Sequence, residues 1–411
     1  MSAKATDVPC RSCGKKDLKV FLDLGKTPLA DRLLTKEQLA EDEPVFPLEV
    51  AFCTNCAMVQ ILETVPPEIL FCDDYPYFSS FSDHLLKHNR DNALDVIERY
   101  KVGPESLVVE LASNDGYLLK NYVEQGIPVL GIDPAEGPAK AAEEIGVPTM
   151  NTFFTLDLAK QLAGEGKRAD VIHANNVLAH VADTNGFVAG IFELLTDEGV
   201  AVIESPYCKD LIDHLEFDTI YHEHLLYLTA TGLDHLFRRH NLYLNDVRRT
   251  EIHGGSLRMY VQRVENVGDS VKDLLKLEND EGFNKLSYFE NFSAKVESFK
   301  ADLLKMLTDL KGQGKRIVAY GAPAKGSTMI NYVGIGTDLI EYTVDRNVHK
   351  QGKFMPGKHI PIYSHEKILE DMPDYVLILP WNFTEEILSQ QDAYRKAGGK
   401  FIVPIPSPVI V

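Results

Sequence analysis

Four cysteines near the N-terminus place the strongest constraint on how this chain can fold. They form two Cys-x-x-Cys pairs, one of Cys10 and Cys13 and one of Cys53 and Cys56. A two-residue spacer lets both sulfurs of a pair face one metal ion, and four thiolates complete the tetrahedral coordination of Zn²⁺. A disulfide or a redox pair is the alternative, but neither explains why two such pairs occur so close together. We therefore predict a structural zinc site with no coordination position open for catalysis.

The composition is that of a soluble globular protein with room for two or three domains. The chain has 411 residues, of which 45% are hydrophobic and 25% charged. Its formal charge of −19, from 61 acidic and 42 basic residues, opposes binding to nucleic acid or to an anionic membrane surface. Neither a long apolar run nor a signal-peptide pattern is present. We expect a cytoplasmic protein, monomeric or weakly oligomeric, without a nucleic-acid or membrane partner.

Strands and helices alternate from Ser106 onward. The apolar segments that we interpret as strands are 107–111, 129–132, 170–174 and 199–204. Strands separated by helices of this length predict a parallel sheet, with ligands bound at the carboxyl ends of the strands.

The turn after the first of these strands indicates which cofactor the sheet binds, a dinucleotide or another nucleoside. A dinucleotide site needs Gly-x-Gly-x-x-Gly, whereas the turn at 112–116 contains only Gly116. An acid within the strand, Glu110, and another at the end of the next strand, Asp133, suit a ligand whose ribose hydroxyls donate to a carboxylate. S-adenosylmethionine (SAM) is such a ligand, and its sulfonium tolerates acidic surroundings. The residues that we expect to contact SAM are Glu110, Asn114, Asp115, Gly116, Asp133, Asn175 and Asn176.

Four proton-handling side chains are consecutive at Tyr221, His222, Glu223 and His224. Histidine titrates close to neutral pH, and a neighbouring carboxylate can orient it. A zincin site is excluded because it needs His-Glu-x-x-His, and here the second histidine comes two positions early. A surface role and a metal-binding role both stay open on these residues alone.

The C-terminal part contains a strand, a small-residue turn and a helix start at 315–328. It is not a Walker A loop, because Gly326 is followed by Ser327 and Lys325 is on the wrong side. The helix N-terminus could still receive a phosphate through backbone N–H groups. A basic cluster at 346–353 offers the positive charge that a nucleotide diphosphate requires, although a solvated basic loop is the alternative.

A set of motifs in this order resembles the nucleotide-sugar C-methyltransferases. The motifs are Cys10-x-x-Cys13, Cys53-x-x-Cys56, Tyr75-Pro-Tyr-Phe-Ser-Ser80, Glu110-Leu-Ala-Ser-Asn-Asp-Gly116, Gly131-Ile-Asp-Pro134, Ala174-Asn-Asn-Val-Leu-Ala-His180 and Tyr221-His-Glu-His224. Such enzymes methylate C-3′, or in relatives another ring carbon, of a nucleotide-linked 4-keto-6-deoxyhexose during branched deoxysugar biosynthesis. The resemblance implies an α/β fold with a zinc-binding domain at 1–68, a SAM-binding Rossmann-like methyltransferase domain at 69–265, and a C-terminal Rossmann-like domain at 266–411 that completes the sugar-nucleotide site.

Methylation beside a ketone needs a base at the α-carbon and hydrogen-bond donors at the ketone oxygen. We predict that His224 is the base and that Glu223 orients it, with Tyr221 as the second candidate. The resemblance implies that His180 and Tyr75 lie near the ketone and stabilise the enolate. The residues that we expect at the nucleotide-linked keto-deoxysugar are Tyr77, Ser79, Lys325, Ser327, Arg346, Lys350 and Lys353.

Two alternatives share part of this pattern. One is a SAM-dependent methyltransferase for another small molecule, which protection by a nucleoside diphosphate would distinguish. The other is a zinc-knuckle interaction protein with a degenerate methyltransferase fold, which requires a dead SAM site although Glu110, Asp133, Asn175 and Asn176 are all present.

Overall fold

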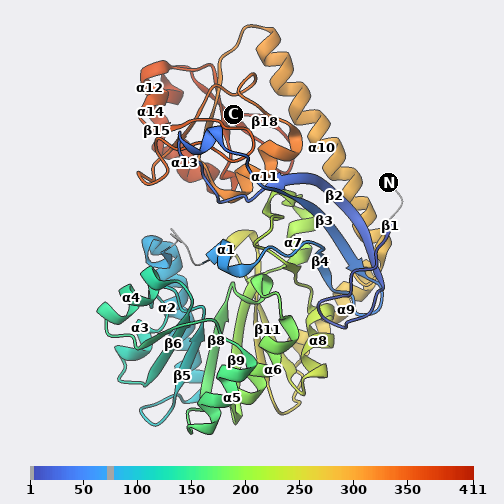
Figure 1. The fold of residues 1–411 in the computed structure, drawn as a ribbon, viewed down its shortest axis with the longest axis vertical. Coiled ribbons are helices and arrows are strands. Elements are labelled where there is room, and N and C mark those ends of the chain that lie inside the picture. The colour runs from blue at the N-terminus through green and yellow to red at the C-terminus, as the bar shows by residue number, and fades with distance from the viewer. Residues whose placement is uncertain (1–3, 72–77) are drawn as a thin grey trace.

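The computed structural model describes residues 4–71 and 78–411, and these residues form three β-sheets. In Figure 1 the sheet of the central part of the chain (green and yellow) is at the bottom, and that of the C-terminal part (red) is at the top. The N-terminal strands (blue) lie beside the junction of these two parts. The N-terminal, central and C-terminal parts of the chain therefore all lie next to one another at this junction.

The N-terminal sheet is antiparallel and has the strand order β1-β2-β3-β4-β10. Its strands are β1 (Lys4–Ala5), β2 (Leu18–Pro28), β3 (Val45–Cys53), β4 (Val59–Ile61) and β10 (Leu226–Tyr227). The last strand follows the Tyr-His-Glu-His run by one residue and pairs with β4, where Leu226 lies opposite Gln60. The run is thereby held against the zinc-binding part of the chain, a contact that no local pattern predicted.

The central sheet has the order β11-β12-β9-β8-β5-β6-β7, in which β12 is antiparallel to both neighbours and the strands from β9 to β7 are parallel. Its strands are β5 (Val108–Leu111), β6 (Val129–Asp133), β7 (Thr149–Asn151), β8 (Ala169–Asn175), β9 (Leu195–Pro206), β11 (Tyr243–Thr250) and β12 (Ser256–Gln262). The predicted parallel sheet is confirmed. A turn at 117–119 separates β5 from the helix that begins at Lys120.

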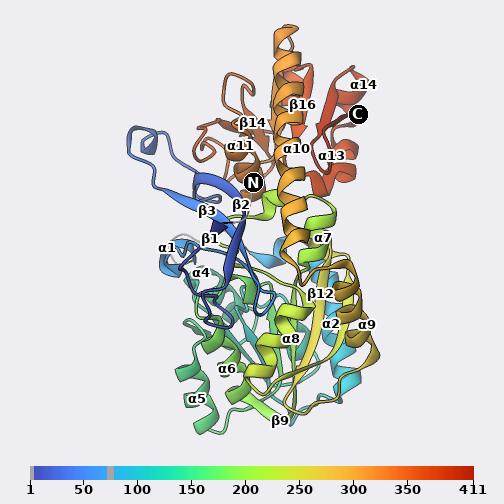
Figure 2. The same cartoon turned by 90° about the vertical axis from the view of Figure 1, so that its right-hand side faces the viewer.

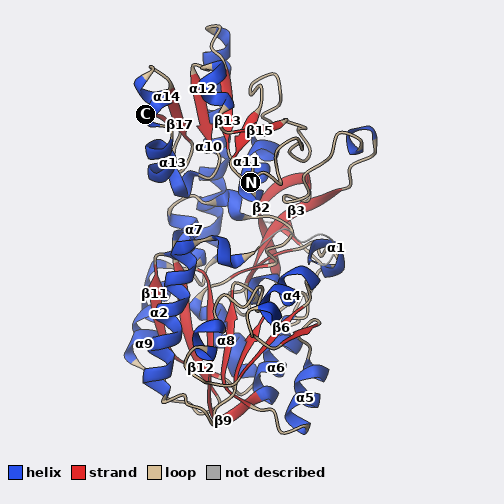
Figure 3. Ribbon diagram, turned by 90° about the vertical axis from the view of Figure 1, so that its left-hand side faces the viewer, coloured by secondary structure: helices blue, strands red, loops and turns tan. Residues whose placement is uncertain are grey.

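Helices flank the central sheet on both sides (Figure 3). They are α2 (Asp83–Tyr100), α3 (Lys120–Val123), α4 (Glu136–Glu144), α5 (Leu156–Gly164), α6 (Thr184–Leu194), α8 (Ala230–Arg239) and α9 (Asp269–Glu281). Shorter elements of the N-terminal and central parts are α1 (Pro67–Phe71), α7 (Cys208–Asp213) and the 3₁₀ turns η1 (Gln38–Ala40), η2 (Ser79–Phe81), η3 (Leu178–His180), η4 (Phe217–Thr219) and η5 (Ile252–Gly254).

The C-terminal sheet has the order β15-β14-β13-β16-β17-β18 and is parallel except for β18. Its strands are β13 (Ile317–Tyr320), β14 (Thr343–Asp345), β15 (Ile362–Ser364), β16 (Tyr375–Ile378), β17 (Lys400–Val403) and β18 (Val409–Ile410). The accompanying helices are α11 (Ala324–Val333), α12 (Lys367–Asp371), α13 (Thr384–Gln390), α14 (Asp392–Lys396) and the 3₁₀ turn η6 (Trp381–Phe383). After β13 the chain adds β14 and β15 on one side of that strand and then β16 and β17 on its other side. The order of the strands therefore reverses between β13 and β16, and α/β sheets bind ligands at such a switch point.

The long helix α10 (Leu286–Gly312) extends from beside the N-terminal strands along the side of the C-terminal part (Figure 1 and Figure 2). Its buried residues recur at helical spacing, and they include Phe289, Phe292 and Phe299. Phe289 packs against the N-terminal sheet, with its ring centroid 4.8 Å from that of Phe52. Each such buried ring contributes about 1.5–3 kcal/mol of hydrophobic stabilisation, so α10 stabilises the contact between the regions. No helix in the described ranges has both the length and the apolar character needed to cross a membrane.

Candidate active site

The four cysteine sulfurs converge on one point beside the N-terminal sheet. All four Sγ atoms lie within 4.8 Å of one another. The Sγ atoms of Cys10 and Cys56 are 3.7 Å apart, and those of Cys13 and Cys53 are 3.6 Å apart. Tetrahedral zinc with Zn–S bonds of about 2.3 Å separates its sulfurs by about 3.8 Å. The donor set therefore fits Zn²⁺, and the predicted metal site is confirmed.

The two turns that carry the Cys-x-x-Cys pairs, called the zinc knuckles below, contact helix α8 of the central region. His235 of α8 approaches the carbonyl oxygen of Cys56 with its Nδ1 at 3.3 Å. Arg239, from the same helix, donates to the Ser12 hydroxyl over 2.5 Å. The metal thus orders an N-terminal segment that contacts α8, which is a structural role.

The carboxyl ends of β5 and β6 bring together acidic and amide side chains. The carboxyl group of Asp133 accepts the backbone N–H of Asn114 at 2.8 Å and that of Ala135 at 2.9 Å. Glu110 is fully buried, and neither of its carboxyl oxygens has a hydrogen-bond partner within 4–71 and 78–411. Burial, with a smaller contribution from Asp133 and Asp115, raises the pKa of Glu110 well above its usual value. Buried polar atoms without protein partners are suited to a bound ligand.

The same edge carries further orphaned acceptors that would suit SAM. The described structure offers no hydrogen-bond partner to one buried side-chain oxygen in each of Asp115, Asn175 and Asn176. The Asn175 amide donates to Asn89 of α2 at 3.0 Å, which leaves its oxygen unpaired. The turn that bears Asn114 and Asp115 needs the left-handed backbone of Gly116, whose φ is +77°. Donors of a ribose or of an amino group can approach these oxygens.

The carboxyl ends of β5, β6 and β8, with Glu110, Asp133 and Asn175, are called the SAM edge below. Ser79, which we expected at the sugar substrate, is hydrogen-bonded to this edge. Its backbone N–H donates to the side-chain oxygen of Asn114 at 2.9 Å, and that of Ser80 donates to Asp115 at 3.0 Å. Tyr75 and Tyr77 lie outside the described residues.

Tyr221, His180 and His224 form an aromatic cluster. The ring centroid of His224 is 4.1 Å from that of Tyr221 and 4.9 Å from that of His180. The Nδ1 atom of His224 lies 2.7 Å from the carbonyl oxygen of Thr219. Because a carbonyl only accepts, Nδ1 carries the hydrogen and Nε2 is the basic nitrogen. His180 uses its Nδ1–H in the same way, on the carbonyl oxygen of Glu223 at 2.6 Å.

Both histidines are neutral at physiological pH. Burial, together with the neighbouring His180, lowers the pKa of His224 to about 3. Burial also lowers the pKa of His180 to about 4. The cluster therefore presents unprotonated imidazoles.

The side chain of Glu223 does not have the orienting role that we expected. The partner of His224 Nδ1 is the carbonyl of Thr219, while Glu223 contributes its backbone oxygen to His180. Burial raises the pKa of the Glu223 carboxyl to about 8, so it is largely protonated near neutral pH. His222 points to the N-terminal sheet, where its Nε2 lies 3.2 Å from the carbonyl oxygen of Pro47.

A second cluster connects this segment to the C-terminal sheet. The Lys325 ammonium, on α11, donates to the Asn382 side chain at 2.9 Å and lies 4.6 Å from the Trp381 ring centroid. The Trp381 indole N–H donates to the Asp218 carboxyl at 2.8 Å. Asp218 belongs to η4, which directly precedes the Tyr-His-Glu-His run. Sequence reasoning assigned no role to Asp218 or Trp381; the signal available was that Trp381 is the only tryptophan of the chain.

The basic loop after β14 lies against the turn between β13 and α11. The Lys350 ammonium donates to the carbonyl oxygen of Ala322 at 2.8 Å. Arg346 is exposed and Lys353 is half-buried on the same loop. Ser327 is buried in α11, and its hydroxyl has no partner among the described residues. Of the expected substrate residues that the structure describes, Lys325 and Ser327 lie on α11 and Arg346, Lys350 and Lys353 on the loop that contacts the turn before it, whereas Ser79 lies near the carboxyl ends of β5 and β6.

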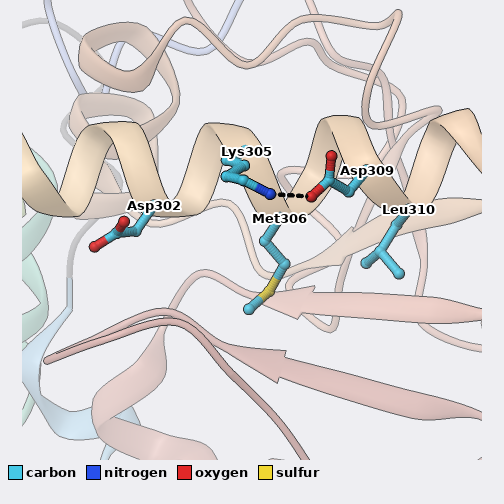
Figure 4. Close-up of a pocket in the computed structure, with 5 residues that line it drawn as sticks. All are labelled: Asp302, Lys305, Met306, Asp309 and Leu310. Carbon is cyan, nitrogen blue, oxygen red and sulfur yellow. Dashed lines mark hydrogen bonds and ion pairs between the residues drawn. The ribbon is translucent and has the colours of Figure 1, made fainter.

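A surface hollow elsewhere contains none of these groups. It is lined by α10 alone, where Lys305 pairs with Asp309 (Figure 4).

Comparison with known proteins identifies the family. Family models match along the chain: "Putative zinc binding domain" at 10–71, "Methyltransferase domain" at 83–247 and "C-methyltransferase C-terminal domain" at 251–406. The C-methyltransferase NovU of Streptomyces niveus is 33% identical over 405 residues, which cover 98% of this chain and 96% of that protein. The chain belongs to the C-methyltransferase family. This C-methyltransferase is SAM-dependent, acts on a small molecule and carries a zinc-binding domain.

More distant likenesses are confined to part of the C-methyltransferase. A ubiquinone biosynthesis O-methyltransferase of Azorhizobium caulinodans is 28% identical over 102 residues, 24% of this chain and 39% of that protein. The solved structure of the magnesium protoporphyrin IX methyltransferase of Synechocystis PCC 6803 with bound SAM covers 43% of this chain and 79% of its own, at 11% identity and a TM-score of 0.33.

Proposed function

We propose that this C-methyltransferase transfers the methyl group of SAM to C-3′ of a nucleotide-linked 4-keto-6-deoxyhexose through an enolate, in branched deoxysugar biosynthesis. One observation carries the proposal. His224 is a neutral imidazole whose Nδ1–H is held by Thr219 and whose Nε2 is its basic nitrogen. It lies six residues after Asp218, whose carboxyl binds Trp381 of the C-terminal region, and a methyl donor and an acceptor bound to the central and C-terminal parts would meet there.

The reaction needs an acid–base step followed by a displacement. His224 Nε2 takes the proton from the carbon beside the ketone, and the C–H electron pair forms the enolate. The enolate carbon then attacks the methyl carbon of SAM, and the sulfonium leaves as a neutral thioether. SAM supplies the electrophile, while the protein holds the proton and the charge on the oxygen.

Tyr221 and His180 differ as donors to the enolate oxygen. His180 already gives its Nδ1–H to Glu223, so its other ring nitrogen could donate only as an imidazolium. The Tyr221 ring lies against His224 and carries an O–H that donates in its ordinary neutral form. We propose Tyr221 as the principal donor among the described residues, with His180 and Tyr75 in supporting roles.

The pKa of His224 also limits when it can act. With a pKa of about 3 it is a weak base in the free protein. An anionic acceptor and the developing enolate favour the imidazolium, which raises the basicity of His224 when the substrate is present. The neighbouring Lys325 and His180 act in the opposite direction, since both favour the neutral ring.

The C-terminal sheet repeats the hydrogen-bond pattern of the SAM edge. Asp345, at the end of β14, accepts the backbone N–H of Ala322 at 2.8 Å and that of Asn347 at 2.8 Å. Asp133, at the end of β6, accepts backbone N–H groups from the turn after β5 and from the residue two positions later in the same way. This likeness to a nucleoside-binding edge, with Lys325 and Lys350 beside it, supports a sugar nucleotide as the acceptor.

Mass spectrometry after incubation with SAM and a panel of nucleotide-linked 4-keto-6-deoxyhexoses tests the function. We expect one member of the panel to gain a single methyl group and to lose its α-proton. The position of a ¹³C-methyl label, read by NMR, then identifies the acceptor carbon. No gain on any member, in a protein that binds SAM, would favour another small-molecule acceptor.

A further inference from the structure

Asp218 is a buried acid at the contact between the central and the C-terminal regions. Its side chain is fully buried, and one oxygen accepts the indole N–H of Trp381 at 2.8 Å. Its other oxygen is buried without a hydrogen-bond partner among the described residues. A buried carboxyl with so few donors destabilises a fold unless something offsets its desolvation. Packing alone therefore does not explain an acid at this position.

Lys325 lies on the other side of the contact, 4.6 Å from the ring centroid of Trp381, whose indole N–H donates to Asp218. Burial lowers the pKa of the Lys325 ammonium, and the carboxyls of Asp218 and Glu216 oppose that lowering. The lysine belongs to α11 of the C-terminal region, whereas both acids belong to the segment before His224. Ionisable groups of both regions thus meet at the contact.

Hydrogen bonds and ring contacts hold the η4 turn that carries Asp218. The backbone N–H and the hydroxyl of Thr219 both donate to the carbonyl oxygen of Glu216, at 3.1 and 2.7 Å. Phe217 is fully buried, and its ring centroid lies 5.1 Å from that of Phe299 on α10 and 5.5 Å from that of Tyr332 on α11. A displacement of α11 or of η6 would therefore move η4 as one unit.

Thr219, the residue after Asp218, holds the ring of His224 through its carbonyl oxygen. We propose that Asp218 is a positioning residue that transmits the placement of the C-terminal sheet, through Trp381 and Thr219, to the ring of His224. This inference rests on the proposed role of His224 as the base. A rotation of the imidazole that misplaces Nε2 by about 1 Å would cost about 100-fold in rate.

The same contact links acceptor binding to alignment of the base. An anionic group of the acceptor that approaches Lys325 competes with Asp218 for the charge of the ammonium. Occupancy of the C-terminal side then changes the interactions of η4 and, through Thr219, the orientation of His224. Acceptors that lack this anionic group would bind without aligning the base.

Two variants separate this role from simple packing. Trp381→Phe removes the indole donor and keeps an aromatic ring beneath Lys325. Asp218→Asn keeps an acceptor for the indole and removes the charge. Tyr394→Phe is the matched control, because it removes one buried hydrogen bond of the C-terminal region, to the Pro373 carbonyl oxygen at 2.8 Å, in α14.

The first measurement needs no substrate. In full-length, zinc-loaded protein labelled with ¹⁵N-histidine, the Nδ1–H resonance of His224 is assigned by its disappearance in His224→Asn. We expect this resonance to shift or broaden in Trp381→Phe and in Asp218→Asn and to stay in place in Tyr394→Phe. An unchanged resonance in both variants would overturn the positioning role, whichever acceptor the enzyme uses.

The second measurement follows the proton transfer itself. With an acceptor that the wild-type enzyme methylates, exchange of the α-proton with D₂O solvent and kcat for methylation are compared among the variants. We expect both rates to fall about 10- to 100-fold, with SAM affinity unchanged. A raised KM with unchanged kcat would instead make Asp218 and Trp381 acceptor-binding residues and overturn the inference. If the wild-type enzyme methylates no sugar nucleotide, the proposed function fails, while the resonance of His224 still decides the positioning role.

Discussion

The carboxyl oxygens of Glu216 lie against Gly254, 2.8 Å from the position that a Cβ atom would occupy there. Gly254 follows His253, whose Nε2 is 3.3 Å from the side-chain nitrogen of Asn176 at the SAM edge. The turn at 253–255 therefore lies between the SAM edge and the acids that precede the Tyr-His-Glu-His run. A glycine at position 254 is needed for this close approach, because a Cβ atom there would meet the Glu216 carboxyl.

Replacing Gly254 by alanine should destabilise the protein. The backbone φ of Gly254 is +89°, and the added methyl would press on Glu216. We expect a loss of about 1–3 kcal/mol in the free energy of unfolding, measured by chemical denaturation. Gly312→Ala is the control, because a Cβ atom at Gly312 meets nothing within 4 Å; it should change stability by less than about 1 kcal/mol. Equal stability of the two variants would contradict the close contact.

Glu216→Gln should change how stability depends on pH. Burial, followed by repulsion from Asp218 and Asp210 and opposed by Lys325, raises the pKa of Glu216 to about 8 from an ordinary 4.5. Between these values the folded state holds a proton that the unfolded state has lost, so this group stabilises the fold at low pH and the contribution disappears as pH rises through about 8. Unfolding curves from pH 5 to 9 should therefore fall less steeply in the variant. Parallel curves would show that Glu216 does not titrate in this range.

His224→Asn should lose methyl transfer while it folds normally. Asparagine can still donate to the Thr219 carbonyl, but it offers no basic nitrogen. We expect kcat to fall by about 10²–10⁴-fold, with zinc content and SAM affinity by calorimetry unchanged. Tyr221→Phe keeps the ring that packs on His224 and removes the proposed donor, so it should also lose turnover while folding and binding SAM. An active His224→Asn enzyme would exclude His224 as the base.

Loss of a zinc ligand should release the N-terminal knuckles. Cys13→Ser should lower the zinc content, measured by atomic spectroscopy, and lower the thermal midpoint, because metal binding contributes on the order of 10 kcal/mol to folding in small zinc domains. Cys208→Ala is the control, since Cys208 is a buried thiol outside the cluster. Equal zinc content in the two variants would contradict the ligand assignment.

Several features could be predicted from the sequence because they depend on local spacing. The two Cys-x-x-Cys pairs identify the metal ligands, since two residues between thiolates suit one ion wherever the knuckles lie. The apolar segments at 107–111 and 129–132, with helices between them, indicate the parallel sheet. The acids at Glu110 and Asp133 then come to the same sheet edge, because parallel strands end together.

The surroundings of the proposed base could not be predicted in this way. Glu223 was expected to orient His224 because the two are adjacent in sequence, but adjacent side chains in this irregular segment point in different directions. The Thr219 carbonyl has that role, since the chain folds back over five residues. Trp381 and Asp218 are 163 residues apart, and only the packing of the C-terminal sheet on η4 brings them together.

The sequence by itself determined the zinc ligands, the order of strands and helices, and the identity of the titratable run. Each of these depends on residue type and short-range periodicity. The tertiary structure decided that this run is followed by β10 of the N-terminal sheet, that its surroundings lower the pKa of His222 and His224, and that Trp381 of the C-terminal region binds Asp218 just before it. These properties depend on burial and on charges from distant parts of the chain, which arise only when the three regions pack against one another.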